Sequence, residues 1–175
     1  MGSHRRVAVA WQSAEGRFVS TGSHAGYTIQ INAPAPPGDD ARPPTGYSPI
    51  ELLLASAGAC AAWDVVQMLR KRRLSLLAVD VEVEGFQADQ PPWEYERIAL
   101  HFVVRCQRLT VGVLERVVRL AVVRYCGALA TVRGVATVEA SLELVGGDGE
   151  SSGRQPVRLD VAVVEPLDEP RADEG

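Results

Sequence analysis

The chain has 175 residues, of which 46% are hydrophobic and 23% charged, and its formal net charge is −4. These values are typical of a single soluble domain with one hydrophobic core, and they give no general attraction to nucleic acid. Three cysteines are too few, and odd in number, for a secreted disulfide framework. With no signal-peptide pattern at the start, we expect the protein in the cytoplasm.

Two short strands are predicted near the start of the chain, at residues 7–11 and 26–32, with the turn-rich segment SAEGR between them. A hairpin of these two strands is the simplest arrangement. Residues 33–47 contain five prolines, which exclude regular structure and predict a surface loop. Because this loop leads directly into a helix, we expect it to shape the mouth of a pocket.

The pattern SPIE predicts the start of that helix. Ser48 suits the N-cap, Pro49 the first helical position, and Glu51 closes a capping box by accepting from the backbone N–H of Ser48. The helical pattern runs to about Arg72, which places Cys60 in the middle of the helix. A thiol at that position is too far from the helix start to be activated by the helix dipole.

Residues 50–69 of this helix are nearly long enough to cross a bilayer. Charged and amide side chains interrupt the stretch, and its many small residues lower its hydrophobicity. We therefore expect a helix buried in protein on nearly every side, and no membrane partner. The basic run at residues 70–73 is expected to be a solvated helix end, where cations are favoured.

Alternating patterns predict strands at 77–85, 97–105 and 137–145, and a second helix at 111–125 capped by Thr110. Cys106 continues the apolar face of its strand and is expected to be a core residue, whereas His101 lies on the opposite face as a surface or interface residue. Residues 151–175 are a predicted C-terminal extension, with a possible strand at 157–164 before a mobile acidic tail.

Cys60 and Cys126 are the residues most suited to chemistry. Each is carried by a predicted helix, and Gly127 after the second one suits a helix C-terminus. If the fold brings the two thiols together, one thiolate can attack a peroxide or disulfide and the other can resolve the product. Their separation excludes a CxxC motif, and no neighbouring His or Cys supports a zinc site, so we expect no metal and no cofactor.

The segments SPIELLLASAGACAAWDVV and RYCGALATVRGVATVEASLEL resemble those of the OsmC/Ohr family of peroxide-reducing proteins, especially its YhfA-like branch. The resemblance covers about residues 5–145. It implies an α+β domain, residues 1–150, with two long central helices packed against curved antiparallel sheets in an intertwined homodimer. It also implies an active site at the dimer interface.

When the family's site residues are carried over by position, the resemblance implies that Cys60 is the peroxidatic nucleophile and Cys126 the resolving thiol. It implies an arginine that stabilises the thiolate, for which Arg42 and Arg17 are the candidates, either of which could instead be simply solvated. The family's glutamate, which orients that arginine, directly follows the helix-start proline.

In this chain that position is Ile50. Glu51 is one residue further, about 100° round the helix, and could substitute for the glutamate only if the helix start were rotated.

Three functions remain open. The first is a thiol peroxidase that reduces a small organic hydroperoxide and is itself reduced by an external dithiol. Its substrate preference would come from an apolar lining formed by Leu53, Ala57, Trp63 and Met68. The second is a family member without peroxidase activity that binds a small apolar or electrophilic ligand at the dimer interface, as the departure at Ile50 suggests. The third is a structural dimer with packed, inert thiols.

Overall fold

A computed structural model of the chain describes residues 4–13, 16–23, 26–32 and 46–159. The chain forms two compact units, Met1–Leu53 and Leu54–Gly175. Most of the proline-rich segment predicted as a loop, including Arg42, lies outside the described residues, as do residues 160–175. The expectation of one domain over residues 1–150 stays a prediction.

The first unit contains a three-stranded antiparallel sheet in the order β1-β2-β3. Its strands are Ala8–Gln12, Arg17–Thr21 and Thr28–Asn32. The predicted hairpin of the first and third strands is therefore wrong, because Arg17–Thr21 pairs with both of them. Trp11 faces Phe18 across the first pair, with ring centroids 4.9 Å apart, and such aromatic contacts between strands stabilise a sheet.

The predicted helix is α1, Pro49–Lys71, and its capping box is confirmed. The backbone N–H of Ser48 donates to Glu51 Oε2 at 2.7 Å, and the N–H of Glu51 donates to Ser48 Oγ at 3.3 Å. The basic residues of the last turn are exposed, as expected for a solvated helix end.

The expectation that α1 is buried on nearly every side is wrong for the single chain. Its buried residues form one stripe, consisting of Ala57, Gly58, Ala61, Val65 and Leu69. Trp63 is 57% exposed on another side. By length and composition α1 could cross a membrane, a test that the core helices of water-soluble proteins also pass.

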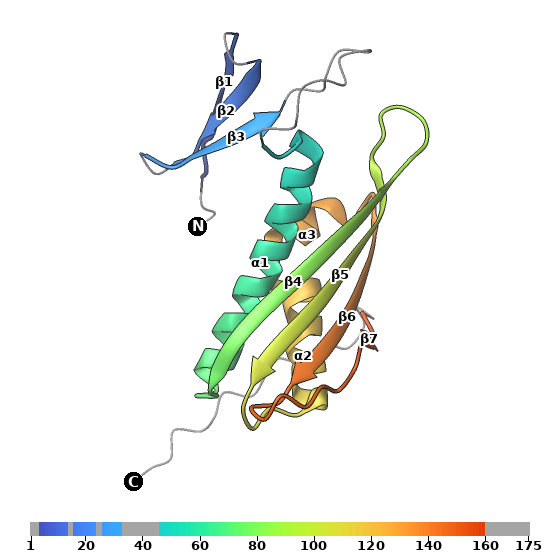
Figure 1. Cartoon of the computed structure of the whole chain (residues 1–175). Coiled ribbons are helices and arrows are strands. Elements are labelled where there is room, and N and C mark those ends of the chain that lie inside the picture. Colours follow the sequence, from blue (N-terminus) through green and yellow to red (C-terminus); the bar gives the residue numbers. More distant parts are fainter. Residues whose placement is uncertain (1–3, 14–15, 24–25, 33–45, 160–175) are drawn as a thin grey trace. The chain divides into compact units, whose positions relative to one another are not determined.

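The second unit is built on a four-stranded sheet in the order β4-β5-β6-β7. Its strands are Leu76–Gln87, Tyr95–Cys106, Thr137–Val145 and Gln155–Val157. The chain crosses from β5 to β6 through α2 (Val111–Leu120), a π-helical turn η1 (Ala121–Tyr125) and α3 (Gly127–Val132). In Figure 1, α1 and α2 lie against the same face of this sheet, which confirms the α+β class.

One strand pairing departs from the antiparallel sheets that the resemblance implied. β5 and β6 are parallel, because the helical crossover returns the chain to the same end of the sheet. The last strand is Gln155–Val157, not the predicted 157–164, of which the residues from 160 onward lie outside the described chain.

The core lies between the sheet and α1 and α2. Every second residue of β5 is buried toward the helices, including Phe102 and Cys106, while His101 on the other face is half-buried. α1 approaches β4 so closely at Gly58 that an added Cβ would lie 2.7 Å from Val83 Cγ2. A side chain at that position would push the helix off the sheet.

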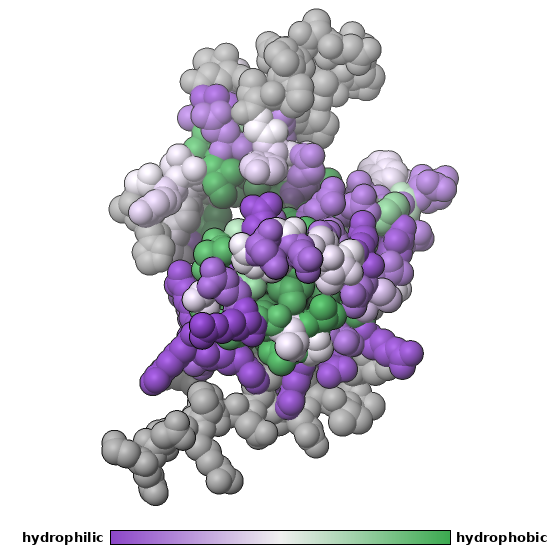
Figure 2. All heavy atoms as spheres, turned by 60° about the horizontal axis from the view of Figure 1, so that its bottom comes forward, coloured by the Kyte–Doolittle hydropathy of each residue, from purple (hydrophilic) through white to green (hydrophobic). Residues whose placement is uncertain are grey.

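This unit also leaves apolar surface uncovered. Leu77 is 61% exposed and Val135 is 69% exposed. On the face presented in Figure 2, hydrophobic side chains gather in a central area bordered by hydrophilic ones. Exposed apolar areas of this kind are typical of surfaces that meet a partner.

Candidate functional site

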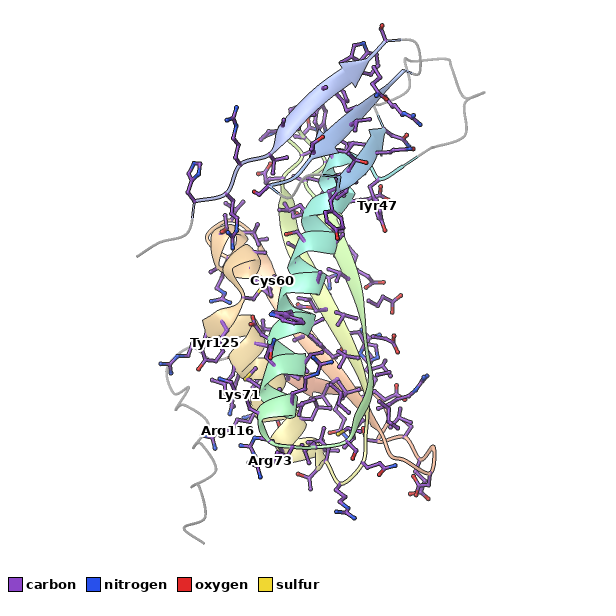
Figure 3. The ribbon with its side chains drawn as sticks, turned by 90° about the vertical axis from the view of Figure 1, so that its left-hand side faces the viewer. Tyr47, Cys60, Lys71, Arg73, Arg116 and Tyr125 are labelled. Carbon is purple, nitrogen blue, oxygen red and sulfur yellow. The ribbon has the colours of Figure 1, made fainter. Side chains whose placement is uncertain are left out.

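Cys60 lies midway along α1, on the border between the buried stripe and the exposed side of the helix, and is half-buried (Figure 3). The next residue on its exposed side, one turn further along the helix, is Trp63, whose ring is largely open to solvent. Of the other predicted lining residues, Ala57 is buried and Met68 is half-buried. The thiol is therefore accessible beside an apolar surface.

Cys126 is positioned by a break between two helices. The π-helical turn η1 ends with the N–H of Cys126 donating to the carbonyl of Ala121 at 2.9 Å. The chain then becomes extended at Cys126, whose sulfur caps α3 by accepting from the N–H of Leu129 at 3.4 Å. Gly127 begins α3 and is not the left-handed C-terminal residue that the sequence predicted, because the chain turns into a new helix here.

The fold brings Cys60 and Cys126 together. The Cys126 side chain is 2% exposed, its thiol donates to the carbonyl of Ala57 at 3.8 Å, and it also hydrogen-bonds to the Cys60 thiol. Burial raises the pKa of Cys126 to about 11, and the Cys60 thiol raises it as well, while the Leu129 N–H opposes the shift. At neutral pH the Cys126 thiol is therefore protonated.

Arg133, directly after α3, holds the break in place. Its guanidinium donates to the carbonyl of Val123 at 2.9 Å and also to the carbonyl of Val122. Both carbonyls belong to the π-helical turn. Arg133 therefore ties the end of α3 back to η1, with Cys126 between them.

Two further polar groups are buried on α1 and α2. Within the described parts of the chain, Asp64 Oδ2 and Arg119 Nε are buried without a hydrogen-bond partner. Asp64 lies one turn after Cys60 on α1, and burial raises the pKa of its carboxyl. Such groups stay in a protein when something compensates their desolvation or when function uses them.

The remaining predicted site residues are not part of this pair. Arg17 lies in β2 of the first unit, where it donates to Gln12 Oε1 at 3.2 Å and to Gln30 Oε1 at 3.0 Å. Hydrogen bonds from Ser48 lower the pKa of Glu51, whose carboxylate caps α1. A role for either in stabilising a thiolate stays a prediction, as does one for Arg42, which lies outside the described residues.

Cys106 has the packing role that the sequence predicted. It is 1% exposed at the end of β5, and burial raises the pKa of its thiol. Among the described residues, no three His, Cys, Asp or Glu side chains are grouped so that they could hold a metal ion.

Sequence reasoning identified both cysteines but missed what positions the second one. The π-helical turn has no sequence pattern of its own, because its residues AVVRY continue the amphipathic stripe of α2. Arg133 likewise gave no local signal, since its partners lie in a different helical segment.

Comparisons with known proteins identify the family and the fold of the chain. The family of OsmC-like proteins matches residues 38–141. Protein YhfA of Escherichia coli is 31% identical over 98 residues, covering 56% of this chain and 73% of YhfA. A hypothetical protein from Aquifex aeolicus has a similar structure, with a TM-score of 0.70 and 26% identity over 83% of this chain and 98% of its own.

The organic hydroperoxide resistance protein OhrB of Bacillus subtilis has a TM-score of 0.54 and is 18% identical, covering 80% of this chain and 98% of OhrB. At that identity the likeness concerns the fold alone.

Proposed function

Because the chain belongs to the OsmC-like protein family, we propose that it is a thiol peroxidase that reduces organic hydroperoxides. The observation that carries the proposal is that the buried Cys126 thiol lies against α1, where it donates to the carbonyl of Ala57 at 3.8 Å and is close enough to Cys60 for the two thiols to interact. The name of the Bacillus subtilis OhrB, an organic hydroperoxide resistance protein, adds support from a chain of the same fold.

The different surroundings of the two thiols support different roles for them in this proposal. Cys60 is accessible, whereas Cys126 is buried and protonated at neutral pH, so Cys60 is the thiol that a substrate can reach. Its thiolate attacks the terminal oxygen of the hydroperoxide, forming an S–O bond as the O–O bond breaks. The departing alkoxide takes a proton and leaves as the alcohol, and Cys60 becomes a sulfenic acid.

Cys126 completes the cycle from its buried position. Its sulfur attacks the Cys60 sulfur, an S–S bond forms, and the sulfenic oxygen leaves as water with the proton of the Cys126 thiol. An external dithiol then reduces the disulfide. The cytoplasm, where thiols are kept reduced, is the compartment that this cycle requires.

We further propose that the protein acts as a homodimer. The exposed apolar side chains Trp63 and Tyr125, at 57% and 48%, lie on the two helical segments that carry the cysteines. A second copy covering them would exclude water from the thiols.

A thiol count tests the cycle. Addition of cumene hydroperoxide to the reduced protein should remove two of the three titratable thiols per chain, and peptide mapping should find a disulfide between Cys60 and Cys126. Cys106 should stay free, which makes it the internal control. Retention of all three thiols, or a disulfide that includes Cys106, would overturn the proposal.

One observation favours a second candidate, a ligand-binding protein with an unreactive thiol pair. Ile50 follows the helix-start proline, and the neighbouring carboxylate of Glu51 is already engaged by Ser48. Without an acidic residue to orient a cation, thiolate formation at Cys60 loses support. In that case the thiol count stays at three, while small electrophiles still alkylate Cys60.

A further inference from the structure

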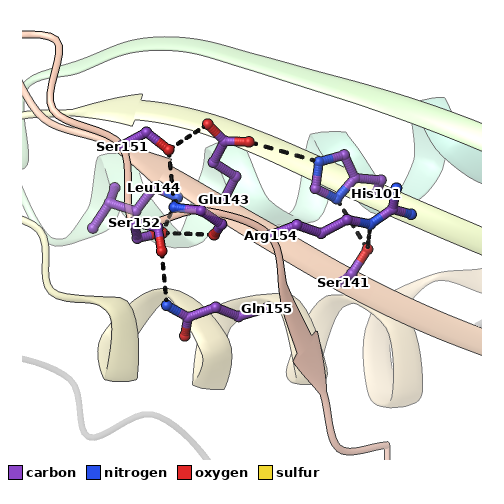
Figure 4. Close-up of polar contacts among 9 residues, drawn as sticks. His101, Ser141, Glu143, Leu144, Ser151, Ser152, Arg154 and Gln155 are labelled. Carbon is purple, nitrogen blue, oxygen red and sulfur yellow. Dashed lines mark hydrogen bonds and ion pairs between the residues drawn. The ribbon is translucent and has the colours of Figure 1, made fainter.

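A second polar cluster lies on the opposite face of the sheet from the helices. His101 of β5 and Ser141 of β6 face each other, with Nδ1 and Oγ 2.9 Å apart. Arg154, just before β7, donates from Nε to the same Ser141 oxygen at 3.1 Å (Figure 4). His101 Nε2 lies 4.0 Å from Glu143 Oε2, and the other Glu143 oxygen accepts from Ser151 at 2.5 Å.

One hydrogen bond in this cluster has a fixed direction. Arginine is always a donor, so Ser141 Oγ accepts from Arg154. This bond restricts the guanidinium, and among the described residues its two terminal nitrogens have no hydrogen-bond partner. Within residues 46–159 and the described strands of the first unit, no carboxylate pairs with Arg154.

Arg154 and Ser141 lie at the rim of an open pocket of about 400 Å³. Most of its other lining is apolar and comes from β5, β6 and the segment around β7; Ala99 and Pro156 share the sheet face of Ser141, and Leu159 follows β7. The lining has one carboxylate, Glu139, which pairs with Arg97 at 3.1 Å. The pocket therefore combines an apolar wall with one cation that has no counter-charge among the described residues.

We propose that this pocket binds a small amphipathic carboxylate, such as a medium-chain fatty acid. The carboxylate receives two parallel hydrogen bonds from the terminal nitrogens of Arg154, a geometry that suits a planar guanidinium. The alkyl chain lies along Ala99, Pro156 and Leu159, which removes its surface from water. Ser141 acts as a positioning residue, because it orients the guanidinium.

This site uses no residue of the cysteine pair and does not depend on the peroxidase proposal. The test is a calorimetric titration of the full-length protein with sodium octanoate, repeated with 1-octanol. We expect saturable binding of one octanoate per chain and binding of octanol weaker by about tenfold or more, since a hydrogen-bonded charge pair is lost. Amide chemical shifts should change along β6 and β7.

The variant Arg154→Gln should weaken octanoate binding by about tenfold or more. Its matched control is Arg158→Gln, an exposed arginine in the same segment that does not line the pocket. Ser141→Ala should weaken binding by a smaller factor while leaving the melting temperature of the protein nearly unchanged. Arg154→Lys should fall between wild type and Arg154→Gln, because lysine keeps the charge without the planar fork.

Several results would overturn the site. They are the absence of saturable octanoate binding, equal binding of octanol, and an Arg154→Gln variant that binds like Arg158→Gln. Loss of octanoate binding on alkylation of Cys60 would place the ligand beside the thiols and would also contradict it.

Discussion

Cys106 and Cys126 are both buried, at 1% and 2% exposure, and burial raises the pKa of both thiols. They differ in what lies beside them. At the end of β5, Cys106 donates only to the neighbouring backbone carbonyl of Gln107, at 3.5 Å. At the junction of η1 and α3, Cys126 meets the thiol of Cys60. Burial alone gives a packed core residue, whereas burial beside a second, accessible thiol gives a pair that can be oxidised.

The largest expected effect distinguishes the thiol pair from the packed thiol of Cys106. Cys60→Ser should abolish consumption of cumene hydroperoxide in the presence of a dithiol, because a hydroxyl without an adjacent base is a very weak nucleophile. Cys106→Ser should keep the wild-type rate, provided that the folded protein is obtained. Full activity in Cys60→Ser would remove Cys60 from the reaction.

Cys126→Ser should stop the reaction after one turnover. Serine can still cap α3 by accepting from Leu129, so the fold should be retained. Mass spectrometry should find one or two added oxygens on Cys60 of the variant and none on the wild type. Sustained turnover of Cys126→Ser by the dithiol would show that no resolving thiol is needed.

Arg133→Gln should loosen the junction that positions Cys126. Loss of the hydrogen bonds to η1 should lower the free energy of unfolding by about 1–3 kcal/mol. Disulfide formation should slow severalfold while sulfenic acid formation at Cys60 keeps its rate, as stopped-flow experiments can resolve. Arg105→Gln, on the exposed part of β5, is the control. Equal slowing of both steps would indicate general destabilisation.

Ile50→Glu tests the position at which the resemblance implied a glutamate. If an arginine is available, the new carboxylate should orient it toward the Cys60 thiolate and so speed both alkylation of Cys60 and its reaction with hydroperoxide, by up to about tenfold. The capping box should persist, since it joins Ser48 and Glu51. Ile50→Gln supplies the uncharged control, and equal rates for the two variants would argue for the ligand-binding alternative.

The smallest expected effect concerns Asp64. Burial raises the pKa of its carboxyl in the folded state above the unfolded value of about 3.9, so the folded protein binds more protons between those two values. Stability should therefore decrease as pH rises through that window, and Asp64→Asn should lose this dependence and be more stable at neutral pH. Urea unfolding of both proteins from pH 3 to 7 measures it.

A variant that is less stable than wild type at neutral pH would contradict this expectation. It would mean that the Asp64 carboxylate has a favourable partner in the assembled protein. A homodimer interface covering α1 is where such a partner would lie.

Much of the second unit could be predicted because its patterns are local. The alternation in residues 137–145 gave β6 with both of its ends. Parallel pairing of β5 with β6 could not be predicted, since it depends on where the crossover returns the chain. In the first unit, the SPIE pattern gave the start of α1, but Arg17 was assigned to a turn and the strand that begins at it was missed.

The candidate site, too, could be predicted only in part. Cys60 and Cys126 stand out as residue types in their sequence neighbourhoods, but their contact depends on how α1 packs beside the α2–α3 crossover. The cluster of His101, Ser141 and Arg154 joins three segments with no common motif, and so only the fold reveals it.

The π-helical turn before Cys126 determines where the site is sensitive to the length of the chain as well as to its residues. A π-helical turn accommodates one residue more than an α-helical turn does, and each residue of an α-helix rotates the chain by about 100°. Deleting one residue within Ala121–Tyr125 should restore a regular helix. Because the turn itself absorbs the extra residue, such a deletion should leave the residues on either side in rotational register. Deleting one residue from the α-helical α2 should instead rotate the chain by about 100° and turn the Cys126 sulfur away from Cys60.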